Sequence, residues 1–264
     1  MSAVAVVMIG VKARRNAGFS LIELSIVLVI MGVLIGAVIR PVVAEYEDKI
    51  LEETQRALDD ARDALMGYAA ANGYLPCPAD AASNGLEAKG TDHNTGACPG
   101  GWYGFLPAAT LGLTSADASG YAVDGTRRPA NRVRYAVSNE TLAGVANTFT
   151  RRSGMRQAGV KSLDQNLFFI CASGTGVNPG IDCGTAGTLT SRAVAVVWSV
   201  GGNASTGGAS VHEAQNPNPN GGTADRIFVS RPRSVIPGAE FDDALVWLPA
   251  HVLVNRLVAA GRLP

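Results

Sequence analysis

One acidic side chain interrupts an apolar stretch near the start of the chain. The stretch runs from Phe19 to Ile39, and Glu23 is its only charged residue. A basic segment with Lys12, Arg14 and Arg15 precedes it. A carboxylate inside an apolar helix carries a large desolvation cost unless a cation meets it. Glu23 is therefore expected to have a partner and a specific role.

Elsewhere the residues that could do chemistry form no recognisable catalytic group. The three histidines, His93, His212 and His251, stand far apart in sequence. None lies in a nucleophile, zinc-protease, phosphate-loop or dinucleotide-binding pattern. We therefore predict that the chain is not an enzyme and uses no cofactor. His93 lies in a polar loop, where a lone histidine is expected to be solvated.

A calcium site is the one metal site that the acidic residues suggest. Asp225, Asp242 and Asp243 lie near a segment rich in glycine and asparagine, residues 201–222. The spacing is not that of an EF-hand loop, and the ligands cannot be counted from sequence. Turn-forming aspartates are favoured, so no metal is predicted.

The stretch Gly18-Phe19-Ser20-Leu21-Ile22-Glu23, with its basic leader and apolar run, resembles the class III signal of type IV pilins and of the pseudopilins of type II secretion. The resemblance implies that a prepilin peptidase cuts between Gly18 and Phe19 and methylates the new amino terminus on Phe19. It also implies that Glu23 meets the terminal amine of a neighbouring subunit and so sets the axial register of a filament. An ammonium and a carboxylate that meet in an apolar core offset much of each other's desolvation cost.

The chain divides into four predicted segments. Residues 1–18 are the leader that the peptidase removes. Residues 19–39, at about 1.5 Å per residue, are long enough to cross a bilayer and form a transmembrane or filament-core helix. Residues 40–73 continue as an amphipathic helix, with a bend or melted turn expected at Arg40-Pro41. Residues 74–264 form a β-rich head.

The amphipathic helix has two predicted faces. The apolar face, expected to pack under the head, consists of Ile50, Thr54, Ala57, Leu58, Ala61, Leu65 and Tyr68. The other face carries eight acids between Glu45 and Asp63, against Lys49, Arg56 and Arg62. A solvated face is the favoured interpretation, and a contact with another subunit is the alternative.

A basic stretch in the head is the natural partner for such a contact. It comprises Arg127, Arg128, Arg132, Arg134, Arg151, Arg152, Arg156 and Lys161, with Glu140 as the only acid. Such a cluster could also hold the phosphates of DNA, but charge alone is a weak signal and few aromatic residues are interleaved. Nucleic acid is therefore the disfavoured partner. The chain as a whole has 22 basic and 22 acidic residues.

The head is predicted to be an antiparallel sheet of about four or five strands. The expected strands are residues 131–137, 167–170, 193–200, 226–230 and 241–248, followed by a helix at residues 249–260. Residues 102–107, an aromatic cluster, are expected to pack the base of a loop against the long helix. Residues 201–222 are expected to form a long, mobile surface loop.

The four cysteines are expected to form disulfides, because an exported head is in an oxidising compartment. Four cysteines allow three pairings. We favour Cys77 with Cys98 and Cys171 with Cys183, because each pair closes one local, glycine-rich loop. The spacing, with no CxxC pattern, argues against a zinc site.

Taken together, these features predict an α+β, pilin-like subunit in which a long N-terminal helix packs on an antiparallel sheet. The expected function is that of a structural subunit, a minor pilin, of a type IV pilus-like filament. The alternatives are a type II secretion pseudopilin and an adhesin or DNA receptor displayed on a pilus. The expected partners are prepilin peptidase, other pilin subunits and the inner membrane, with the head in the periplasm before the chain enters a pilus or pseudopilus.

Overall fold

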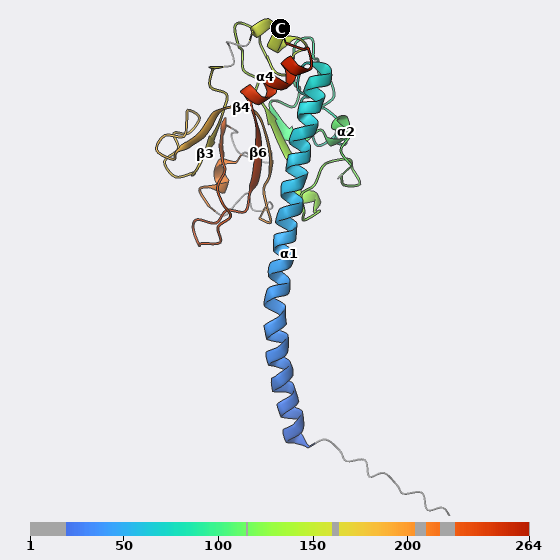
Figure 1. The fold of residues 1–264 in the computed structure, drawn as a ribbon, viewed down its shortest axis with the longest axis vertical. Helices are drawn as coiled ribbons and strands as arrows, with labels where there is room; N and C mark the ends of the chain where they lie inside the picture. Colours follow the sequence, from blue (N-terminus) through green and yellow to red (C-terminus); the bar gives the residue numbers. More distant parts are fainter. Residues whose placement is uncertain (1–19, 115, 160–163, 204–209, 217–224, 264) are drawn as a thin grey trace, which may run out of the picture. The chain divides into compact units, whose positions relative to one another are not determined.

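The structure is a computed structural model of the chain (Figure 1). It describes residues 20–114, 116–159, 164–203, 210–216 and 225–263, apart from the side chains of residues 37–44 and 130. The chain forms two compact units, Met1–Glu47 and Asp48–Pro264, which are described in turn. The second unit is called the head below.

Helix α1, Leu21–Asn72, begins in the first unit. It continues without interruption through Arg40 and Pro41, so the melted turn predicted there is wrong. A proline inside a helix removes one backbone hydrogen bond, and the regular turns on both sides can maintain the helical path.

The apolar side chains of the first unit have no cover within the chain. Every large apolar side chain from Leu21 to Ile35 is at least 45% exposed. A continuous exposed apolar surface of this kind indicates a surface that something else covers. Among the described residues, no helix has both the length and the hydropathy of a membrane span. The membrane span predicted at residues 19–39 extends beyond the described side chains of this segment, which end at residue 36, and it stays a prediction.

In the head, α1 presents the predicted apolar face. Thr54, Leu58, Ala61 and Leu65 are buried, at the three- and four-residue spacing of one helix side. Ile50, Ala57 and Tyr68 lie at the edge of this face and are half-buried.

Within the described part of the head, six strands form one sheet. The strands are β1 (Tyr103–Phe105), β2 (Arg134–Val137), β3 (Phe168–Cys171), β4 (Thr188–Ser199), β5 (Ile227–Val229) and β6 (Ala244–Pro249). Their order is β1-β2-β4-β3-β5, and β6 also pairs with β4. The short helices are α2 (Ala108–Leu111), α3 (Gly154–Ala158) and α4 (Ala250–Ala259), with 3-10 turns η1 (Pro129–Asn131) and η3 (Glu213–Gln215).

The long strand β4 organises this sheet. Its first half pairs with β3, from Thr188 to Ala193, and its second half pairs with β6, up to Ser199. Strand β2 pairs along the second half too, with Tyr135 opposite Val197. The predicted strand at residues 131–137 is shorter than expected, because its first residue belongs to the 3-10 turn η1.

The sheet is mixed, so the predicted purely antiparallel sheet is wrong. Strands β3 and β5 are parallel, with Ile170 opposite Phe228. Because β4 runs antiparallel to β3, the chain leaves β4 at the end where β3 begins. Strand β5 then starts at that end and pairs with the other edge of β3, which makes the two strands parallel.

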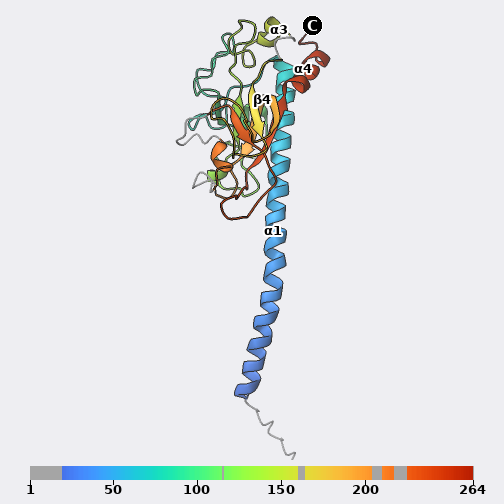
Figure 2. The same cartoon turned by 90° about the vertical axis from the view of Figure 1, so that its left-hand side faces the viewer.

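Both faces of the sheet are buried. Leu58 and Leu65 of α1 pack with Tyr135, Val197 and other residues of one face. Helix α4 lies beside the C-terminal end of α1 (Figures 1 and 2), and its Leu253 and Leu257 join the same cluster.

The second sheet face carries an aromatic cluster. In this cluster the ring centroid of Trp198 lies 5.1 Å from that of Phe228, and the ring centroid of Trp102 lies 5.4 Å from that of Phe168. Trp102 and Tyr103 therefore pack on this cluster and not on the cluster that contains the residues of α1. The prediction that the aromatic segment packs against the long helix is wrong for these two residues.

Part of the predicted mobile loop is ordered and buried. His212, Glu213 and Asn216 are each at most 7% exposed. The imidazole Nδ1 of His212 accepts a hydrogen bond from the Gly174 N–H at 3.0 Å. The prediction of a wholly mobile surface loop at residues 201–222 is therefore wrong for residues 210–216.

Candidate functional site

The predicted processing site lies at the edge of the described chain. Gly18 and Phe19 lie outside the described residues, but Ser20 and Glu23 form a reciprocal cap at the start of α1. The Ser20 N–H donates to Glu23 Oε2 at 3.0 Å, and the Glu23 N–H donates to Ser20 Oγ at 3.3 Å. This is the capping-box arrangement, which satisfies two backbone donors that a helix start leaves without partners.

The cap gives Glu23 a role that the sequence interpretation did not include. Its carboxylate is held at the backbone N–H of residue 20, one residue after the predicted Phe19 amino terminus. The partial positive charge of the helix start also favours a carboxylate at this place. That Glu23 meets the amine of a neighbouring subunit stays a prediction.

The cysteines pair locally in the head. Cys77 is bonded to Cys98 and Cys171 to Cys183, with 5.5 Å between the Cα atoms of each pair. These are the two pairs that the sequence analysis favoured among three possible pairings, and all four cysteines are used.

His93 is held inside the first disulfide loop. Its Nε2 lies 3.1 Å from Glu87 Oε1, its Nδ1 lies 2.8 Å from the Thr150 carbonyl oxygen, and its ring packs 4.2 Å from that of Tyr74. The prediction of a solvated histidine is therefore wrong. Burial by itself lowers the pKa of His93, but the hydrogen bonds to Glu87 and Thr150 outweigh it, and the pKa is raised.

A group of three carboxylates lies at one end of the sheet. Glu213, Asp242 and Asp243 each offer an oxygen, and these oxygens lie within 4.8 Å of one another. Asp225 is elsewhere, where it accepts hydrogen bonds from the N–H groups of Gly180 and Ile227. The sequence analysis noticed Asp242 and Asp243 but missed Glu213. No local pattern signals the burial of Glu213, because its apolar neighbours Val211 and Ala214 are themselves exposed.

Hydrogen bonds from the protein already engage this group. Asp242 Oδ2 accepts from the Gly202 N–H at 2.8 Å, Glu213 Oε2 from Asn203 Nδ2 at 3.0 Å, and Asp243 Oδ2 from Asn216 Nδ2 at 2.5 Å. Carboxylate oxygens are ligands that calcium prefers. The second oxygen of Glu213, Oε1, accepts from the Asp242 N–H at 3.0 Å. With both oxygens of Glu213 and one oxygen of each aspartate engaged, the arrangement favours a structural role in fastening residues 210–216 to the start of β6.

The electrostatics of the group agree with a structural role. Burial raises the pKa of Asp243 to about 8, and the charges of Glu213 and Asp242 act in the same direction. Burial also raises the pKa of Asp242. The guanidinium of Arg134, itself 3% exposed, lowers the pKa of Asp243 but does not compensate for burial. Near neutral pH the group therefore retains a proton on Asp243.

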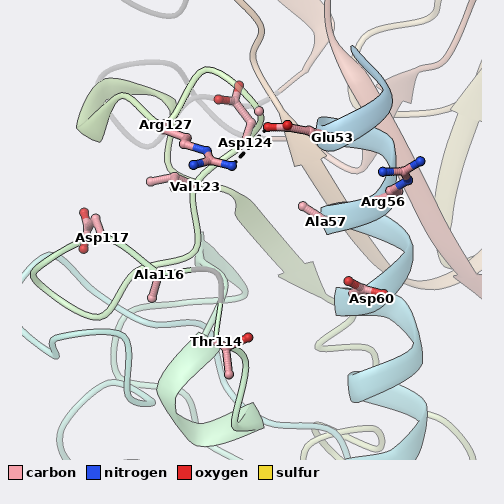
Figure 3. Close-up of a pocket in the computed structure, with 11 residues that line it drawn as sticks. Glu53, Arg56, Ala57, Asp60, Thr114, Ala116, Asp117, Val123, Asp124 and Arg127 are labelled. Atoms are coloured by element: carbon pink, nitrogen blue, oxygen red, sulfur yellow. Dashed lines mark hydrogen bonds and ion pairs between the residues drawn. The ribbon is translucent and has the colours of Figure 1, made fainter. Parts of the chain in front are cut away.

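A groove runs between α1 and the segment after α2 (Figure 3). Its volume is about 560 Å³, and Glu53 and Asp60 of α1 face Asp117 and Arg127 across it, whereas the side chain of Arg56 points away from them. A smaller hollow of about 290 Å³ continues it and adds Asp63 to the lining. We call the two together the acidic groove.

The structure divides the predicted basic stretch. Arg127 pairs with Glu53 at 3.3 Å, Arg132 pairs with Asp117 at 2.8 Å, and Arg134 is buried under the sheet's edge strand β1, near Phe105. Lys161 lies outside the described residues. Residues 127–161 therefore do not form one continuous basic surface, because Arg127 and Arg132 are paired and Arg134 is buried, whereas Arg128 is exposed.

Comparison with known proteins gives one match. Residues 13–39 match the family of the prokaryotic N-terminal methylation motif. Neither a curated protein nor a solved structure matches the chain. The match covers the residues from which the resemblance was inferred, including Gly18, Phe19 and Glu23. The chain thus carries the N-terminal methylation motif, which is the prepilin-type signal of type IV pilins and pseudopilins.

Proposed function

We propose that this protein is a structural subunit of a type IV pilus-like filament, and specifically a minor pilin. The observation that carries the proposal is the methylation motif at residues 13–39, which spans the capped start of a 52-residue helix. The motif implies processing by prepilin peptidase and assembly with other pilin subunits. The protein acts as a building block and is itself not an enzyme.

The exposed apolar side chains of residues 21–35 support the assembly step. In the proposal they are covered by membrane lipid before assembly and by other N-terminal helices in the filament core afterwards. The apolar surface then stays away from water throughout, so the transfer needs no net exposure of it. Glu23 provides the polar contact that distinguishes the correct register from slipped ones, because a slipped register leaves a charge without its partner.

A secretion pseudopilin is the second candidate, because the same motif occurs in both groups. The two differ in where the processed chain accumulates. A pilin leaves the membrane with sheared surface filaments, whereas a pseudopilin stays with the cell envelope.

Quantitative mass spectrometry of sheared filaments and of membranes tests the proposal. Cells with and without prepilin peptidase are compared, and the diagnostic peptide begins at N-methylated Phe19. A small amount of this peptide in the sheared fraction is expected for a minor pilin, and a large amount indicates a major pilin. Processed chain confined to membranes indicates a pseudopilin. Absence of the Phe19 peptide from cells that contain the peptidase contradicts the proposal.

A further inference from the structure

The second half of the basic stretch gathers with C-terminal arginines at one end of the head. Arg156 Nε donates to the carbonyl oxygen of Arg262 at 3.3 Å. Arg262 in turn donates from Nε to the carbonyl oxygen of Ala70 at 3.1 Å, and from Nη2 to that of Ala71, at the end of α1. Arg256 lies in the last turn of α4. We call the exposed side chains of Arg152, Arg156, Arg256 and Arg262 the arginine cap.

Few acids neutralise the arginine cap. Residues 141–163 and 250–264 contain no aspartate or glutamate. Glu140, the one acid of the basic stretch, pairs with Arg226 instead. Asp92 borders the cap through its loop, and its two carboxylate oxygens accept hydrogen bonds from the Asn94 N–H and the Thr95 hydroxyl. The cap therefore presents an excess of positive charge.

The opposite charge lies towards the other end of the same unit. Between residues 48 and 63, α1 carries six acids against three basic residues, and residues 64–72 carry no charge. At about 1.5 Å per residue, Asp60 lies roughly 18 Å along the helix from Asn72, next to which Arg262 is bound. In both views α3 and α4 lie at the end of the head where α1 ends (Figures 1 and 2).

Two acids of the acidic groove are available for an intermolecular contact. Asp60 and Asp63 are exposed, and both line the groove. Asp60 makes no ion pair within the described residues, and Asp63 has only a contact of 3.5 Å with Arg62. Exposed acids in a hollow can receive arginine side chains that are long enough to reach in.

We propose that the arginine cap of one copy docks on the acidic groove of a second copy of this chain, head to tail. The inference rests on the proposed function, because subunits that assemble through their N-terminal helices all point the same way. A copy displaced along the filament then brings its acidic end towards the basic end of its neighbour. Such a contact joins two different surfaces, so it forms wherever two copies of this minor subunit stand next to each other.

A second copy fits the arginine cap better than nucleic acid does. The same chain supplies the complementary charge, whereas its net charge of zero gives no general attraction to a polyanion. Phe149 is the only phenylalanine, tyrosine or tryptophan in residues 141–163 and 250–264, and it is fully buried. Among aromatic rings, these segments therefore expose only the imidazole of His251 to a base.

Charge reversal of the full-length protein in cells tests the contact. The cap variant carries Arg152→Glu and Arg156→Glu, and the groove variant carries Asp60→Lys and Asp63→Lys. Each is expected to lower incorporation into the filament fraction about tenfold, since like charges then face each other across the contact. The chain with all four changes is expected to recover most of the loss. Arg192→Glu, at an exposed arginine outside both surfaces, is the matched control and should incorporate normally.

Cysteine cross-linking measures proximity directly. Co-expression of an Asp60→Cys chain and an Arg156→Cys chain is expected to give a disulfide-linked dimer on mild oxidation of assembled material, because the contact brings these two positions of adjacent copies together. Neither variant expressed alone should give this mixed dimer. No mixed dimer, together with normal incorporation of both charge-reversal variants, overturns the inference and leaves the proposed function standing. A wild-type chain that is not processed and not assembled contradicts the proposed function itself.

Nucleic-acid binding is a separate outcome of the same variants. In a mobility-shift assay at physiological salt with duplex DNA, the purified full-length protein is expected not to shift the DNA. A shift that the cap variant loses, with incorporation unchanged, overturns the proposed contact and assigns the arginine cap to nucleic acid.

Discussion

The imidazole Nε2 of His93 lies 3.1 Å from Glu87 Oε1, and both residues lie within the loop that the Cys77–Cys98 disulfide closes. Glu87 Oε1 also accepts a hydrogen bond from the N–H of Cys77 at 2.6 Å, next to the disulfide. Across the pair, His93 Nδ1 contacts the Thr150 carbonyl oxygen. Both side chains are mostly buried, so the charge state of His93 affects the stability of the loop.

The first prediction is a pH dependence that Glu87 causes. The pKa of His93 is raised by Glu87 and Thr150 against the effect of burial. The stabilisation that protonated His93 gains from these contacts is therefore complete at pH values below the pKa of His93 in the unfolded chain. It is lost as the pH rises through the pKa of His93 in the folded chain. Urea unfolding, followed by the fluorescence of the three head tryptophans, should show that Glu87→Gln costs about 1–2 kcal/mol at pH 6 and less at pH 8.

A double-mutant cycle provides the control. His93→Gln should produce the same change, and the double variant Glu87→Gln/His93→Gln should lose little beyond either single change. Equal destabilisation by Glu87→Gln at both pH values would contradict the assignment to His93.

The second prediction separates the two roles of Glu23. Glu23→Gln keeps a side chain that can accept the Ser20 N–H hydrogen bond but removes the charge, whereas Glu23→Ala removes both. If the charge sets the register, both variants are processed at Gly18-Phe19 but fail to enter filaments. Mass spectrometry of the N-methylated Phe19 peptide in the membrane and filament fractions measures both steps. Normal incorporation of Glu23→Gln would leave only the capping role.

The third prediction concerns Asp243, whose pKa burial raises to about 8. The folded chain retains a proton on Asp243 that the unfolded chain loses near pH 4, so this group reduces stability as pH rises from about 4 to about 8. Asp243→Asn removes the effect, and its stability relative to the wild type should rise over this range by up to about 1.4 kcal/mol per pH unit. Asp60→Asn, at an exposed site, is the control and should give no such slope. If the difference in stability between Asp243→Asn and the wild type does not change with pH, then Asp243 is ionised in the folded head.

The fourth prediction tests how closely the segment after α2 approaches α1 in the head. A Cβ at Gly125 would lie 2.2 Å from the carbonyl oxygen of Ile50, and the Gly125 N–H donates to Thr54 Oγ1 at 3.0 Å. Gly125→Ala should therefore destabilise the head by about 1–3 kcal/mol, since backbone must move to admit the methyl group. Thermal unfolding followed by tryptophan fluorescence measures the loss.

Gly67→Ala is the matched control for this change. A Cβ at Gly67 would meet nothing within 4 Å, and the residue is exposed near the C-terminal end of α1. Alanine has a higher helix propensity than glycine, so this variant should gain about 0.5–1 kcal/mol. A loss of stability in Gly67→Ala as large as that in Gly125→Ala would show that the effect is not specific to the close approach.

Local patterns in the sequence predicted much of the secondary structure correctly. The apolar face of α1 follows the helical spacing of Leu58, Ala61 and Leu65, and the β-branched run at residues 193–200 lies largely in the buried part of β4. Helix α4 and the strands β3, β5 and β6 also lie close to their predicted positions. The missed elements, β1 and α3, have only three and five residues, too few for a periodic pattern to appear.

What the sequence determined by itself is local: the methylation motif of residues 13–39, the long helix, the strand segments and the two loops that disulfides close. Only the tertiary structure decided the parallel pairing of β3 with β5, the approach of Glu213 to Asp242 and Asp243, and the division of the basic stretch. The physical reason is that these features depend on which distant segments the chain path brings together. Arg132 and Arg156 look alike in sequence, yet one is neutralised by Asp117 and the other joins Arg262 at the end of α1.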